Sequence, residues 1–475
     1  MREMMRKTMW ETMRALQCVQ GVPFVFSRRF CIKSVSIVAQ VWVLLVTAFF
    51  TGAVFAADAP VRIAFIDPLS GPFANTGESA LKHFRAAVER DDMLRILNRG
   101  RVGAHAQRRI EIVPFDNKAS AQEALVQLRA VIDQGIRFVL QGQSSAAALA
   151  LSDAIDKHNA RNPLQTVLFL NYAALDPDLT NSKCSFWHFR FDAPVDMRME
   201  ALVEAILRDG TAKNIYLIGQ DYSFGRSVAQ HARAMLARKV PGARIVGDDL
   251  HPIGTVRDFA PYIAKIKAAG ADTVVTGNWG NDLALLVKAA REQGFSGDFY
   301  TFYAGSPGAV TAIGRAGAGK LKQVNEWHPN VQVNGRRTHE AYAAQFKQRY
   351  SEDFRYLRFL TLTEMFASAL ARAGSSDPQR VALALEGMRI STATGEVEMR
   401  ARDHQLIQPL YVSTLTASAQ QGGAPEVVVD TENSGLGFKT DARIEGYATA
   451  QPTSCAMTRP ADQAATRPAA QTVKR

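Results

Sequence analysis

The stretch VRIAFIDPLSGPFANTGESALKHFRAAV (61–88) holds the unit from which most of the chain is built. Its first seven residues form a short apolar run bounded by Pro68 and Gly71, which is typical of a buried β-strand. A helix is predicted over 77–98, because apolar residues recur there at helical spacing. A strand, a polar turn and a helix in this order make the repeating unit of an α/β fold.

The same alternation continues along the chain in two blocks. The first block adds predicted strands at 109–116, 137–142 and 166–172, with helices at 121–135 and 145–158. After a break at DPDLTNSKCSFWHFRFDAP (176–194), the second block has predicted strands at 214–220, 243–249, 272–278 and 298–304, with helices at 196–208, 224–238, 257–269 and 281–293. We expect the later helices and strand to complete these two sheets rather than form a third: 338–350, 359–373, 378–388 and 409–416. The predicted fold class is therefore α/β, with two Rossmann-like lobes whose parallel sheets are flanked by helices.

Composition and charge exclude several classes of protein. Hydrophobic residues make up 47% of the 475 residues and charged residues 21%, which excludes a disordered or collagen-like chain. The net charge of +11 is concentrated at the ends, because residues 1–56 hold seven basic and two acidic residues and the segment after Ala450 holds four and one. The body is close to neutral, so the clustered positive charge that nucleic-acid binding requires is missing.

Residues 1–56 are predicted to be a cleavable signal peptide. A basic region ending at Lys33 precedes the apolar run VWVLLVTAFF (41–50), and small residues end the segment at Val54-Phe55-Ala56. This pattern places cleavage near Ala56, with a single membrane anchor as the alternative. SRRFCIK (27–33) resembles a twin-arginine signal, and an ordinary Sec signal fits the segment equally well.

Two cysteines, Cys184 and Cys455, remain after this cleavage. Export permits a disulfide between them. Cys455 lies in a tail (447–475) that has little to bury and is expected to be disordered. Both a bridge and two free thiols therefore remain open.

Candidate ligand-binding residues follow the predicted strands, because ligands of open α/β sheets bind beyond the carboxyl ends of the strands. Six turns rich in Ser, Asn, Gly and aromatic residues occupy these positions: 67–77, 142–146, 171–176, 219–225, 277–282 and 303–308. From them we select Ser144, Ser145, Ala173, Asp221, Tyr222, Phe224, Trp279 and Tyr303. Ser144, Ser145 and Asp221 also suit helix N-caps, and Tyr222 and Phe224 also suit packing at a helix start.

Motifs for other chemistries are incomplete. GQSSA (142–146) approximates the nucleophile elbow G-x-S-x-G but ends in Ala146, and no downstream histidine lies in a motif that identifies a base, which leaves an exported serine hydrolase as a minor alternative. GRAGAGKL (314–321) resembles a phosphate-binding loop but has Leu321 where a hydroxyl would hold Mg²⁺. The histidines show no metal-ligand spacing, so no metal is predicted. No G-x-G-x-x-G motif opens a helix after the first strand, and no cofactor is predicted.

The turns identify a resemblance to a known family. SGPFA-x-x-G (70–77), the DPDLT stretch (176–180) and DYSFG (221–225) together resemble the periplasmic substrate-binding proteins of the leucine/isoleucine/valine-binding type, over about residues 60–420. The resemblance implies a monomeric, non-enzymatic protein in the periplasm that traps a small polar ligand between two lobes and delivers it to an ABC permease. It places three crossovers near 190–195, 325–330 and 400–405. Lobe 1 would span 57–192 plus 328–403, and lobe 2 would span 193–327 plus 404–446. A ligand-sensing receptor domain of the same fold is the main alternative.

The resemblance also implies roles for individual residues. Ser144 or Ser145 and the backbone of Ala173 match the positions that hold an amino acid's carboxylate in that family. Leu175 stands where a Thr hydroxyl is usual, and Thr76 replaces an aromatic residue. Gly305 and Ser306 occupy the turn that usually carries an acidic partner for the ammonium. Therefore either another carboxylate supplies the charge, or the ligand is not a free amino acid. The candidates for that carboxylate are Asp221, Asp282 and Glu326.

Overall fold

The computed structural model describes residues 59–99 and 108–460, which belong to one compact unit, Asp58–Arg475. The predicted signal peptide (1–56) and the end of the predicted tail (461–475) lie outside the described residues. Within the described ranges, no helix is both long and apolar enough to cross a membrane.

The first sheet has eight strands in the order β13-β14-β15-β5-β4-β3-β1-β2. Five neighbouring strands run parallel to one another, and β15 also pairs in parallel with the last of them. The five are β1 (Val61–Asp67), β2 (Ile110–Asp116), β3 (Phe138–Gln141), β4 (Leu168–Asn171) and β5 (His188–Arg190). The other three strands extend the edge beyond β5: β13 (Arg389–Thr392), β14 (Gly395–Arg400) and β15 (Gln405–Ile407). β1 lies between β2 and β3, which makes this point the switch in strand order where open α/β sheets bind ligands.

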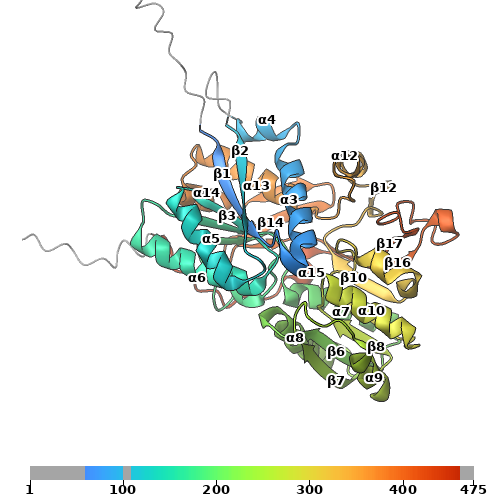
Figure 1. Ribbon diagram of the computed structural model, residues 1–475. Helices are drawn as coiled ribbons and strands as arrows, with labels where there is room; N and C mark the ends of the chain where they lie inside the picture. The colour runs from blue at the N-terminus through green and yellow to red at the C-terminus, as the bar shows by residue number, and fades with distance from the viewer. Residues whose placement is uncertain (1–58, 100–107, 461–475) are drawn as a thin grey trace, which may run out of the picture. The chain divides into compact units, whose positions relative to one another are not determined.

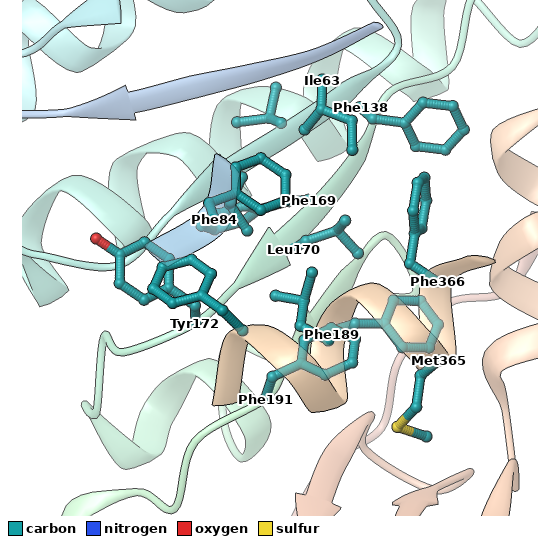
Figure 2. Packing of buried hydrophobic residues seen from close by; sticks show 14 of the residues in the cluster. Ile63, Phe84, Phe138, Phe169, Leu170, Tyr172, Phe189, Phe191, Met365 and Phe366 are labelled. Carbon is teal, nitrogen blue, oxygen red and sulfur yellow. The ribbon is translucent and has the colours of Figure 1, made fainter. Parts of the chain in front are cut away.

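Helices cover this sheet, and we call the sheet with its helices lobe 1. They are α3 (Ala74–Val88), α4 (Met93–Leu97), α5 (Ala121–Asp133), α6 (Ser145–Arg161), α12 (Glu340–Tyr350), α13 (Arg358–Ala373) and α14 (Pro378–Leu385). α5 packs on α6, whereas α13 packs on α3, α4 and α14 (Figure 1). Figure 2 shows the core beneath α13, where aromatic rings from neighbouring strands meet the helix. The Phe138 and Phe366 rings, for example, meet edge to face at 5.0 Å.

The second sheet has seven strands in the order β17-β16-β10-β9-β8-β6-β7. The parallel strands are β6 (Asn214–Gln220), β7 (Arg244–His251), β8 (Thr273–Thr276), β9 (Asp298–Thr301) and β10 (Leu321–Asn325), followed by antiparallel β16 (Leu410–Ala417) and β17 (Leu436–Ile444). Its helices are α7 (Val195–Asp209), α8 (Ser223–Lys239), α9 (Ala260–Ala268), α10 (Asn281–Glu292) and α11 (Ala309–Ile313). Figure 1 shows the parallel strands of this sheet in green and yellow with α8, α9 and α10 beside them. We call this sheet and its helices lobe 2.

The parallel strands of the two sheets share one topology. Both run in the relative order second-first-third-fourth-fifth, so each lobe has a switch point between its first and third strands. This confirms the two-lobed α/β fold that the sequence predicts. The strand predicted at 409–416 is β16 and joins the second sheet as expected, whereas β13, β14, β15 and β17 were not predicted.

Some predicted boundaries differ from the structure. The helix predicted over 77–98 is two helices, α3 and α4, separated by a turn in which Arg90 hydrogen-bonds to Asp92. The third crossover was predicted near 400–405, with lobe 2 resuming at residue 404. However, β15 still pairs with β5 in the first sheet, and the chain passes to lobe 2 between Ile407 and Leu410. Strands as short as β5 and β15, with three residues each, leave no clear apolar run to detect.

The tail also differs from the prediction over its first part. After α15 (Gly446–Thr449), the chain returns to lobe 1, where Cys455 forms a disulfide with Cys184. Thr453 Oγ1 donates to the Thr180 carbonyl at 2.7 Å, and Arg459 forms an ion pair with Glu386. Residues 450–460 are therefore held by a covalent bond and polar contacts, which the low apolar content of the tail does not reveal.

Candidate functional site

A cavity lies between the carboxyl ends of the two sheets. All six predicted turns contribute to its wall, three from each lobe, together with the segment that enters α13. The lining residues are Thr76, Gly142, Gln143, Ser144, Ser145, Tyr172, Ala173, Ala174, Leu175, Tyr222, Phe224, Trp279, Tyr303, Ser306, Tyr356 and Arg358. The structure thus brings seven of the eight predicted site residues to one cavity, the exception being Asp221.

Asp67, the last residue of β1, shapes the turn after β3. Its carboxylate accepts the backbone N–H of Gln143 at 2.9 Å and of Gly142 at 3.2 Å, and the Tyr172 hydroxyl donates to it at 2.7 Å. A Cβ at Gly142 would lie 2.8 Å from the Ala173 nitrogen, so the close approach of the two turns requires glycine. Burial raises the pKa of Asp67 to about 7, although these hydrogen bonds oppose the shift.

The amino end of α6 faces the cavity through this turn. Ser144 is the N-cap of α6, a role that the sequence also suggested for it, and its Oγ accepts the Ala147 N–H at 3.3 Å. Ser145 Oγ accepts the Asp176 N–H at 3.3 Å, which ties α6 to the turn after β4. The first N–H groups of a helix lack partners within the helix, so this end of α6 suits an anionic or carbonyl group.

The turn after β4 is folded around Asn171. Asn171 Oδ1 accepts the N–H groups of both Ala173 and Ala174, at 3.1 and 2.8 Å. The Ala173 N–H that was predicted to bind the ligand therefore already donates to Asn171. Ala173 lines the cavity, but a ligand could only share this N–H with Asn171. Leu175 is buried and lines the same wall.

The wall from lobe 2 is aromatic. The Trp279 indole Nε1–H donates to the Tyr222 hydroxyl at 2.9 Å, and Phe224 packs near Tyr303 with ring centroids 6.2 Å apart. Trp279 also contacts Phe73 of lobe 1, at 4.3 Å between ring centroids. The turns of the two lobes therefore touch across the cavity mouth.

Asp221 does not reach the cavity, which corrects its selection from the sequence. Its carboxylate is half-exposed and forms an ion pair with Arg226, and the N-cap of α8 is Tyr222 rather than Asp221. Asp221 is exposed, whereas the next residue, Tyr222, lines the cavity.

A buried network of four charged side chains lies beside the cavity. Arg358 binds Glu326 through Nε at 2.7 Å and Nη2 at 2.8 Å, and Nη1 pairs with Asp192. Arg198 Nη2 pairs with the other Asp192 oxygen at 2.6 Å. Two cations and two anions balance, and Arg358 is the member that lines the cavity. The two carboxylates raise the pKa of Arg358 against the opposing effect of burial, so the guanidinium stays charged.

Comparison with known proteins places the chain in a family. A model of the periplasmic binding protein family matches residues 60–423. The chain belongs to the periplasmic binding proteins, of the leucine/isoleucine/valine-binding type. Leu/Ile/Val-binding protein homolog 4 of Brucella melitensis is 32% identical over 90% of this chain and 99% of that protein.

Solved structures agree with this assignment. The crystal structure of the leucine-, isoleucine-, valine-, threonine- and alanine-binding protein from Brucella ovis, in a closed conformation, is 31% identical with a TM-score of 0.73 and covers 85% of this chain and all of that one. An amino acid ABC transporter substrate-binding protein from Pseudomonas fluorescens shares the fold at 22% identity, with a TM-score of 0.67 over 84% of this chain and all of that one. This periplasmic binding protein is thus a substrate-binding protein whose ligand-binding region lies between two lobes.

Two lining residues of this periplasmic binding protein escaped prediction from the sequence. Tyr356 and Arg358 come from the segment that enters α13, which follows no strand, so the rule that located the other turns does not apply to them. Histidine, which a serine hydrolase would need beside Ser144, is not among the lining residues that the structure describes. Among residues 59–99 and 108–460, no cluster of His, Cys, Asp or Glu has an arrangement that could hold a metal ion.

Proposed function

We propose that this protein is the periplasmic receptor of an ABC importer and that it captures an amino acid or a related small carboxylate or amide. The observation that carries the proposal is the single cavity lined by the carboxyl-end turns of both sheets. The signal peptide predicted over 1–56 would deliver the protein to the periplasm, and the permease would receive the ligand without any chemical step. Two relatives are named for the binding of leucine, isoleucine and valine, and their names support this class of ligand.

Each lobe contributes a different chemistry to binding. Ser144, Ser145 and the amino end of α6 hold the anionic or carbonyl end of the ligand from lobe 1. Tyr222, Phe224, Trp279 and Tyr303 enclose the rest of the ligand from lobe 2, where rings supply large contact areas.

Ligand binding would select the closed arrangement. Only when the lobes approach do both sets of turns contact the ligand, so binding free energy shifts the hinge equilibrium toward closure. Contacts such as Phe73 with Trp279, and Asn75 with the Pro307 carbonyl, join the lobes beside the cavity. The permease would distinguish the loaded receptor by this closed form.

Replacing Ser144 and Ser145 together by alanine should weaken binding of the best ligand at least about tenfold, since hydrogen bonds to charged groups contribute about 1.5–3 kcal/mol each. The ligand is first found by a thermal-shift screen of amino acids, amides and small carboxylates, and its affinity is then measured by calorimetry. A ligand at 100 times its Kd should stabilise the protein by about 2.7 kcal/mol.

Ser182→Ala is the matched control for this double variant. Ser182 is an exposed serine of lobe 1 whose hydroxyl donates to Asp178 and which does not line the cavity, so its replacement should leave affinity unchanged. Equal affinity of the wild type and the Ser144→Ala, Ser145→Ala variant would contradict the proposed site.

A further inference from the structure

The cavity wall carries one charged side chain and it is a cation. Of the sixteen lining residues, Arg358 alone is charged at neutral pH, and none is Asp or Glu. A free amino acid brings an ammonium into this space, and burying an ammonium without an anionic partner costs several kcal/mol.

The carboxylates nearest the turns are committed to other donors. Asp67 accepts the hydrogen bonds that shape the turn after β3. Asp282 accepts from Gln220 Nε2 at 2.7 Å and from the Gly254 N–H at 2.9 Å, and Asp176 accepts the Asp178 N–H at 3.1 Å. Asp221 is outside the cavity and paired with Arg226.

Asp192 and Glu326 contact Arg358, and of these three residues only Arg358 lines the cavity. Four of the five guanidinium N–H donors of Arg358 are used, by Asp192, by Asn325 and twice by Glu326. The fifth, on Nη1, has no partner among the described residues. The charge network therefore offers the cavity a donor and not an acceptor.

Two aromatic rings of the cavity wall already contact cations of the protein itself. The Arg198 guanidinium lies 5.4 Å from the Tyr303 ring centroid, and Arg358 lies 5.3 Å from that of Tyr356. These two rings already interact with cations, so they attract a further cation less than free rings would. The network of Arg198, Arg358, Asp192 and Glu326 is neutral overall. A second anionic group on the ligand would therefore gain little electrostatic stabilisation beside Arg358.

We propose that the ligand is a small monocarboxylic acid that lacks a free ammonium group and carries a neutral hydrogen-bond acceptor facing Arg358. The carboxylate would lie at the amino end of α6, and the acceptor would be an oxo, hydroxyl or amide oxygen. This inference rests on the proposed function and narrows its ligand class. Arg358 and Ser306, which both line the cavity, would then determine specificity.

Matched pairs of ligands test the inference by calorimetry on the mature, oxidised protein. Leucine is compared with 4-methyl-2-oxopentanoate, alanine with pyruvate and phenylalanine with phenylpyruvate, so each pair differs only in an ammonium or an oxo group. The oxo acid of at least one pair should bind about tenfold or more tighter than its amino acid. Tighter binding of the amino acids would overturn this inference and leave the proposed function standing. If amino acids, carboxylates and amides all failed to bind, both would fall.

Ser306→Asp provides a second readout. Ser306 lines the cavity from the turn after β9, so a carboxylate there would meet a ligand ammonium. The variant should bind the amino acid of the preferred pair at least about tenfold tighter than the wild type and should lose affinity for the oxo acid. Ser182→Asp, on the exposed surface of lobe 1, controls for added charge. An unchanged preference in a folded Ser306→Asp variant would contradict the assignment.

Discussion

Reduction of the Cys184–Cys455 disulfide is expected to lower the free energy of unfolding by about 2–5 kcal/mol. The bond joins residues 271 apart in sequence, and closing so long a loop restricts the unfolded chain strongly. It also anchors the segment that returns from lobe 2 to lobe 1 after α15, so its loss should expose residues 450–460 to proteases. Urea denaturation with and without dithiothreitol, together with limited proteolysis, measures both effects.

The double variant Cys184→Ser, Cys455→Ser is the control for reduction. It should show the lower stability of the reduced protein and should no longer respond to dithiothreitol. A wild-type protein whose unfolding midpoint did not change on reduction would contradict a stabilising role for the bond.

Asp192→Ala is expected to destabilise the fold by about 3–5 kcal/mol, because it leaves two buried guanidinium groups short of a partner. Asp192 lies in the first crossover, and its side chain is fully buried between Arg198 and Arg358. Removing one member of a buried ion network exposes the remaining charges to the full cost of desolvation. Because Arg358 lines the cavity, the variant should also weaken ligand binding.

Asp153→Ala is the matched control for this variant. Asp153 pairs with Lys157 on the exposed surface of α6, where an ion pair contributes little to stability. Chemical denaturation of both variants gives the comparison. Similar unfolding midpoints for the two would show that the buried network does not stabilise the crossover.

Most of the fold could be predicted because strong local patterns repeat along the chain. Apolar runs such as 61–67 and 214–220 are long enough to mark buried parallel strands, and each is followed by helical spacing. Strands β13 to β15 gave no such signal, because they are short and because charged residues such as Glu396 and Glu398 interrupt the apolar residues of β14. Their pairing depends on contacts distant in sequence.

The candidate site was predictable to the extent that it follows strand ends. Ser144, Trp279 and Tyr303 lie in turns directly after strands, and the parallel topology gathers such turns at one edge. Arg358 had no such signal, since it begins a helix that follows another helix and not a strand. The engagement of the Ala173 N–H by Asn171 depends on side-chain geometry within a turn, which residue spacing does not determine.

A crystal structure of the mature protein with its best-binding ligand tests most directly whether the ligand is held between the two lobes. The account predicts ligand density in the cavity, with one end at Ser144 and Ser145 and the other against Trp279 and Tyr303. A ligand bound elsewhere on the protein, or in contact with one lobe only in the closed form, would contradict it.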